Sequence, residues 1–81
     1  MLNKIKKEKH IVIAFDTNTM AFYMEKLKRE NNLDGRIIPL PTVIDAGCGA
    51  AFATKNLDIE YWKKFMQEHK VAYKDIRELI I

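Results

Sequence analysis

The chain has 81 residues, of which 48% are hydrophobic and 31% charged, with a formal net charge of +3. This length allows one small domain with a single core, and the composition is that of a globular protein rather than a disordered chain. One cysteine cannot form an internal disulfide, which excludes the framework of a small secreted protein and makes a cytoplasmic location the expected one. No apolar run approaches the length of a membrane span, so no membrane partner is expected.

The positive charge lies at the N-terminus. Met1–His10 contains four lysines and one glutamate, whereas the remaining residues carry equal numbers of basic and acidic side chains. We therefore expect residues 1–10 to form a flexible basic arm and residues 11–81 to form one domain. Because the domain itself is neutral and Phe52 stands among alanines, without the basic and aromatic residues that stack bases, nucleic acid is not an expected partner.

The first predicted element is a buried strand over Ile11–Phe15, an apolar run rich in β-branched residues. Asp16, Thr17, Asn18 and Thr19 follow, and side chains of these types favour the start of a helix because their oxygens accept from its first free N–H groups. From Met20 to about Asn32 the apolar residues recur at helical spacing. The pattern predicts a strand that leads directly into a helix.

A second strand is predicted over Arg36–Ile38, ending at Pro39, after a turn that closes at Gly35. Gly49–Thr54 predicts a weaker strand, since alanine is poor in sheets. We expect its small side chains to pack closely against a helix.

A second helix is predicted to begin after Asn56 or Asp58, either of which can cap it, and to run to about His69. A final strand falls within Tyr73–Ile81. The order βαββαβ predicts an α+β ferredoxin-like sandwich, with a four-stranded antiparallel sheet covered on one face by two helices. In that topology the loop before the third strand lies at the same end of the sheet as the start of the first helix.

That loop contains the candidate chemical centre, Cys48, within the segment Pro39–Phe52. Gly47 and Gly49 flank the cysteine, so backbone N–H groups and a substrate can approach the sulfur closely. The thiolate is the nucleophilic form of cysteine. The alternative is a structural cysteine, because a free cysteine is often buried and packs as a small hydrophobic residue.

The start of a helix carries partial positive charge and unpaired N–H donors, which stabilise an anion such as a thiolate. Thr17, Asn18 and Thr19 are therefore candidate binding residues, although helix capping alone also explains them. Asp45 would oppose the effect if it pointed toward the sulfur. One cysteine and two distant histidines match no metal-ligand spacing, so neither a metal nor a cofactor is predicted.

Three short motifs occur together in the chain: Ala21-x-x-x-Glu25-Lys26, Pro39-x-Pro41 and Cys48-Gly49-x-Ala51. In these motifs, and from Ile11 to about Ile80, the chain resembles a family of small bacterial proteins described as Se/S carrier-like (DUF3343). The resemblance implies that Cys48 is the carrier thiol and that Gly49, Pro39 and Pro41 belong to its loop. The chain differs from the family pattern at Thr42, where relatives often have a basic residue, and at Asp45-Ala46-Gly47, where they have a serine-rich turn.

The sequence therefore supports two hypotheses. In the first, Cys48 carries sulfur or selenium as a persulfide or selenosulfide between a donor and an acceptor protein, as a carrier rather than a turnover enzyme. In the second, the chain is a non-catalytic interaction module whose cysteine is structural. Small domains of this topology also dimerise through an open sheet face or edge, so a homodimer is a further expectation.

Overall fold

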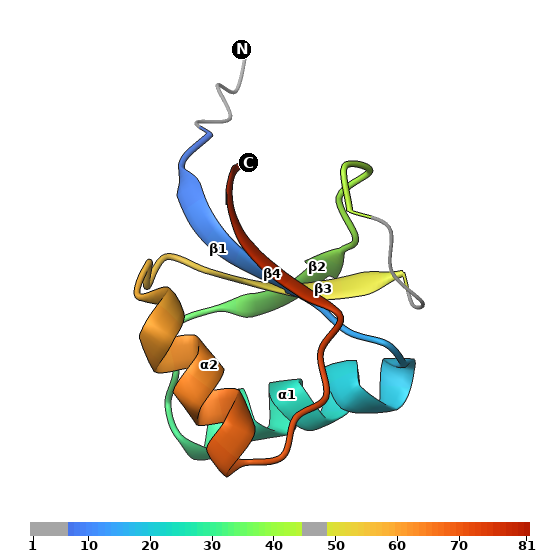
Figure 1. The fold of residues 1–81 in the computed structure, drawn as a ribbon, viewed down its shortest axis with the longest axis vertical. Coiled ribbons are helices and arrows are strands. Elements are labelled where there is room, and N and C mark those ends of the chain that lie inside the picture. The colour runs from blue at the N-terminus through green and yellow to red at the C-terminus, as the bar shows by residue number, and fades with distance from the viewer. Residues whose placement is uncertain (1–6, 45–48) are drawn as a thin grey trace, which may run out of the picture.

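The structure is a computed structural model that describes residues 7–44 and 49–81. It confirms the ferredoxin-like α+β arrangement: one antiparallel sheet of four strands, in the order β2-β3-β1-β4, with two helices on one side (Figure 1). The elements are β1 (Lys9–Ala14), α1 (Asn18–Glu30), β2 (Arg36–Pro39), β3 (Ala50–Thr54), α2 (Ile59–Glu68) and β4 (Asp75–Ile80). In the described part of the chain, neither helix is long and apolar enough to cross a membrane.

The first strand begins earlier than its apolar run. Lys9 and His10, which the charge distribution places in the basic arm, are part of β1 and pair with Ile80 and Leu79 of β4. The pairing continues to Glu8, which exchanges two backbone hydrogen bonds with Ile81, of 3.0 and 3.1 Å. The sequence predicts an arm there because charged residues break the hydrophobic pattern, but the hydrogen bonds of a sheet need only the backbone. Residues 1–6 of the expected arm lie outside the described residues.

The main core lies between the sheet and the helices. Ile11 and Ile13 of β1 and Phe52 of β3 point toward the helices and are fully buried. Trp62 of α2 packs edge-on against the Phe52 ring, with centroids 5.6 Å apart, and its indole N–H donates to the carbonyl of Asn56 at 2.8 Å. The tryptophan thus fills the core and still satisfies its polar atom. Asp58, rather than Asn56, caps α2 by accepting from the Tyr61 N–H.

A second apolar cluster lies on the face of the sheet turned away from the helices. Val12, Ala14, Ala51 and Ala53 are at most 4% exposed there, and Ile44 covers them from the segment that follows β2. The expectation that the alanines of the third strand pack against a helix is wrong for Ala51 and Ala53. Side chains alternate along a strand, and Phe52 occupies the helix side, so its two neighbours face the other way.

Gly35 is the one described glycine whose conformation requires glycine. Its φ is +145°, and an added Cβ would lie 2.6 Å from Cε2 of Phe52 and closer still to Cζ. Gly49 is the matched control, because a Cβ there would meet no atom of residues 7–44 and 49–81 within 4 Å.

We predict that Gly35→Ala lowers the free energy of unfolding by about 3 kcal/mol, because both the backbone strain and the overlap with the Phe52 ring must be relieved. Gly49→Ala should change it by less than about 1 kcal/mol. Urea unfolding monitored by Trp62 fluorescence measures the free energy of unfolding of both variants. Equal effects of the two substitutions would contradict the assigned packing of Phe52.

Candidate functional site

The candidate site lies at the end of the sheet where β1 ends and β3 begins. Ala14, the last residue of β1, pairs with Ala51, the second residue of β3. The chain runs from Ala14 through three residues into α1, and it enters β3 from Gly49. Gly49 therefore lies at the end of the sheet where α1 starts, as the topology predicted. Gly47, Cys48 and Asp45 lie outside the described residues.

The loop that holds Cys48 has a defined base. The Leu40 N–H donates to the Gly49 carbonyl at 2.9 Å, one pair beyond the Pro39 and Ala50 partners of the β2–β3 ladder. Pro39 is tolerated in the sheet because β2 is an edge strand, where a missing N–H breaks no central ladder. The ladder thus fixes the two ends of the loop at Leu40 and Gly49.

A turn follows the base. The Ile44 N–H donates to the Pro41 carbonyl at 3.0 Å, which leaves Thr42 and Val43 exposed at the tip of the turn. Ile44 itself is 4% exposed and packs against the alanine face of the sheet. In Figure 1 this segment, coloured green to yellow, rises from the sheet on the side opposite the helices. Ile44 is therefore the buried hydrophobic contact that, with the partly buried Leu40, holds the described part of the loop against the sheet.

The start of α1 is capped by the residue that the sequence indicates. Thr17 has an extended backbone, with φ −138° and ψ 156°, and its hydroxyl accepts from the Met20 N–H at 3.2 Å. Asn18 and Thr19 are the first two helical residues, and all three side chains are exposed. The first turn of α1 contains no acidic residue, so no carboxylate within that turn offsets the partial positive charge of the helix start.

An ion pair beside the helix start was not anticipated from the sequence. The Lys74 ammonium lies 3.9 Å from a carboxylate oxygen of Asp16, and the Lys74 N–H donates to the Ala14 carbonyl at 2.7 Å. Lys74 thus brings a positive charge to this end of the sheet from the segment that precedes β4. The β1–β4 register, which pairs Ala14 with Asp75, is the signal that could have located it.

The structure accordingly gathers part of the predicted site. Thr17, Asn18, Thr19 and Gly49 share one end of the sheet, and Pro39 forms the base of the loop. Pro41 and Thr42 lie in the turn that leads toward the cysteine. No cluster of side chains able to hold a metal ion occurs within residues 7–44 and 49–81.

Comparison with known families matches residues 10–78 to the model of the family described as "Putative Se/S carrier protein-like". The chain belongs to this family. The match includes every strand and helix of the structure except the ends of β1 and β4, and it includes the whole loop from Pro39 to Gly49. Comparisons with curated proteins and with solved structures give no match.

The anchoring role of Ile44 in this Se/S carrier-like protein gives a prediction. Ile44→Ala should lower the free energy of unfolding by about 2 kcal/mol, because it removes a buried side chain from the alanine face. It should also speed hydrogen exchange of the Leu40 amide, which closes the base of the loop.

Val43→Ala is the control, because Val43 is 65% exposed and its truncation should leave both quantities nearly unchanged. Exchange at Leu40 that is equally fast in the two variants would contradict the anchor. NMR-detected exchange together with urea unfolding provides both readouts.

Proposed function

We propose that this protein carries sulfur or selenium as a covalent adduct on Cys48. The observation that supports the proposal most is the family match, which covers the cysteine loop. The geometry adds to it, because Gly49, the next residue after Cys48, lies at the end of the sheet where α1 starts. Cys48 is the one thiol in the sequence.

The proposed transfer requires no external oxidant or reductant. The Cys48 thiolate attacks the outer sulfur of a donor persulfide, a new S–S bond forms, and the donor leaves as a thiolate. An acceptor thiolate then attacks the same outer sulfur, which yields an acceptor persulfide and restores the Cys48 thiolate. With a selenosulfide on the donor, selenium takes the place of the outer sulfur and the electron count is the same.

The start of α1 favours a thiolate over a neutral thiol at the end of the sheet that holds Gly49. Its partial positive charge stabilises a nearby anion, and Thr17, Asn18 and Thr19 supply hydroxyl and amide donors. The glycines on both sides of Cys48 leave room for a donor and an acceptor to reach the sulfur. In this account Pro39, Pro41 and Thr42 shape the loop rather than touch the chalcogen.

A protein with a single cysteine suits a shuttle. No second thiol in the chain can displace the chalcogen by forming an internal disulfide, so the adduct persists until an acceptor arrives. The partners are therefore a donor and an acceptor protein, each with its own reactive thiol or selenol. We place the exchange in a reducing compartment, where the free thiol is maintained.

The test is chalcogen loading read by intact mass. The native protein, incubated without oxygen with a low-molecular-weight persulfide or with selenide and a disulfide, should gain the mass of one sulfur or selenium atom. Cys48→Ser should gain none. Addition of excess thiol should return the loaded protein to its starting mass, because the outer atom is transferred to the thiol.

Cys48→Ser also serves to examine the alternative, a structural cysteine in an interaction module. If the native protein takes up no chalcogen while the serine variant folds equally well, the carrier proposal fails. An adduct that thiols cannot remove would likewise contradict it, because a carrier must release what it holds.

A further inference from the structure

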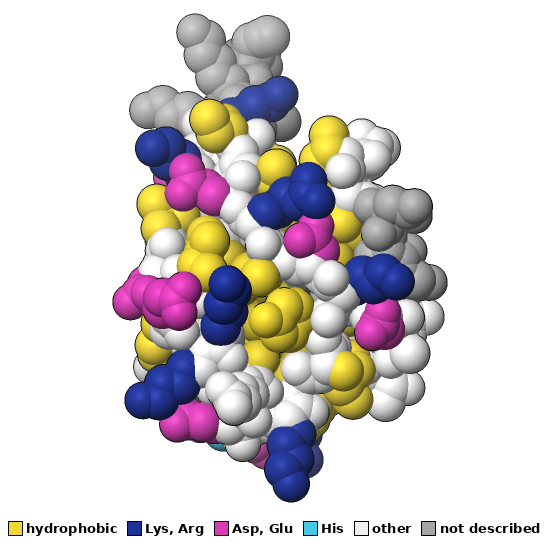
Figure 2. Space-filling model, viewed as in Figure 1, with side chains coloured by type: hydrophobic (Ala, Val, Ile, Leu, Met, Phe, Trp, Pro, Cys, Tyr) yellow, Lys and Arg dark blue, Asp and Glu magenta, His cyan; other side chains and the backbone are white. Residues whose placement is uncertain are grey.

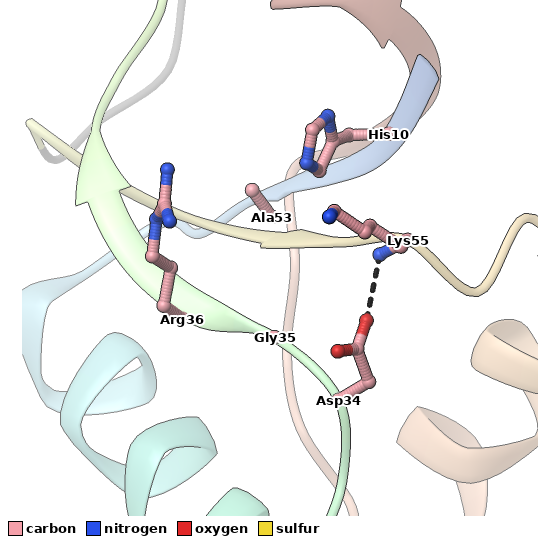
Figure 3. Close-up of a pocket in the computed structure, with 6 residues that line it drawn as sticks. All are labelled: His10, Asp34, Gly35, Arg36, Ala53 and Lys55. Carbon is pink, nitrogen blue, oxygen red and sulfur yellow. Dashed lines mark hydrogen bonds between the residues drawn. The ribbon is translucent and has the colours of Figure 1, made fainter. Parts of the chain in front are cut away.

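A hollow of about 220 Å³ lies on the face of the sheet turned away from the helices (Figure 3). Its lining residues are His10, Asp34, Gly35, Arg36, Ala53 and Lys55. It is distinct from the cysteine loop, because Lys55 and Gly49 lie at opposite ends of β3, about 20 Å apart at the usual rise per strand residue. Neither the proposed carrier chemistry nor any candidate residue from the sequence accounts for it.

The strand register builds the hollow. Ala53 pairs with Arg36 of β2 on one side and with Val12 of β1 on the other, so its methyl group forms a low floor between larger side chains. His10 lies two residues before Val12 in β1, and Lys55 lies two residues after Ala53, just past the end of β3. Both lie on the same face of the sheet as Ala53. Figure 3 shows the Arg36 guanidinium, the His10 ring and the Lys55 ammonium standing around Ala53. Three nitrogen-bearing side chains, one from β1, one from β2 and one from the residue that follows β3, thus surround one small residue.

The lining has an excess of positive charge. Asp34 is its one acidic residue, and its Oδ2 atom already accepts hydrogen bonds from the Lys55 N–H at 2.9 Å and from the Thr54 hydroxyl at 3.3 Å. Lys55 has an exposed ion-pair partner in Glu8, at 3.6 Å. Within residues 7–44 and 49–81 no ion pair or hydrogen bond involves the Arg36 guanidinium.

A hydrogen bond to the backbone holds the His10 ring in place. Its Nδ1 atom donates to the Glu8 carbonyl at 3.0 Å, which fixes the proton on that nitrogen and orients the ring. The Nε2 atom has no hydrogen-bond partner within the described parts of the chain. A bound anion would be the common partner for the free donors of the Arg36 guanidinium and the Lys55 ammonium, with the ring closing the third side.

We propose that this basic hollow binds the phosphoryl group of a small phosphate or phosphate ester. A guanidinium offers two parallel N–H donors that match two phosphate oxygens, and a lysine adds a third charge-assisted bond. Two cationic donor groups, the Arg36 guanidinium and the Lys55 ammonium, suit a tetrahedral dianion better than a planar monovalent carboxylate. The volume is below the roughly 300–1,000 Å³ of pockets that take drug-sized ligands, so the ligand is small.

The test is an NMR titration of the full chain with inorganic phosphate, at constant ionic strength maintained with chloride. We expect saturable shifts at the amides of Arg36, Ala53 and Lys55, and weaker effects from acetate. Arg36→Gln and, separately, Lys55→Gln should each weaken binding about tenfold. Arg29→Gln is the matched control, because Arg29 is exposed on α1 and pairs with Glu25, and it should leave the affinity unchanged.

Glycerol phosphate distinguishes the two sources of the phosphoryl group. Tighter binding than inorganic phosphate assigns an ester to the hollow, and equal or weaker binding assigns the free ion. The proposal is overturned if the shifts do not saturate, if they spread over basic residues elsewhere, or if Arg36→Gln binds as the native protein does. Cys48→Ser should bind phosphate normally, so this test stands apart from that of the carrier function.

Discussion

The pairing register of β1 with β3 is the constraint on which the rest of the structure depends. Ile13 opposite Phe52 puts both side chains into the core beneath the helices, and Ala14 opposite Ala51 puts two small residues on the other face. A slip of one residue would turn Phe52 out of the core, since side chains alternate from face to face. Gly35 has a φ of +145° and lies against the Phe52 ring, so a larger residue would not fit at position 35.

The same register gives the two ends of the sheet different chemistry. At one end it brings Gly49 level with the start of α1, where Lys74 and Asp16 form an exposed ion pair. At the other end the β1–β3 register places His10 near the methyl group of Ala53, and the β2–β3 register places Arg36 beside it. On the face seen in Figure 2, basic and acidic side chains are intermixed rather than gathered by sign. The local arrangement of charge, rather than the net charge of +3, is therefore what could select a ligand.

Much of the fold could be predicted from the sequence because local signals agreed with the global arrangement. Local patterns predicted the elements: the apolar run after His10 indicated the first strand, the cap at Thr17 the first helix, and the helical spacing around Trp62 the second helix. The order of the elements then predicted the topology. Predictions failed where the outcome depended on pairing between distant segments. The alanines of β3 were expected under a helix because nothing local says which face Phe52 takes, and nothing marks Ile44 as the residue that covers them.

Part of the arrangement at the candidate site could be predicted as well. A lone cysteine between glycines is visible in the sequence, and the topology places Gly49, the residue after it, at the end of the sheet where α1 starts. Lys74 and the hollow around Ala53 were missed because their parts are separated by dozens of residues and meet only through the strand register. Charged residues such as His10 and Lys55 also interrupt the hydrophobic pattern, so they read as solvent-exposed positions rather than as parts of one lining.

We propose that the start of α1 makes the Cys48 thiol reactive. The most direct measurement is its alkylation rate as a function of pH, in the folded protein and in urea. If the start of α1 stabilises the thiolate, the folded protein should react faster than the unfolded chain below the ordinary thiol pKa of about 8.5. A thiol that reacts equally fast or more slowly when folded would contradict the account.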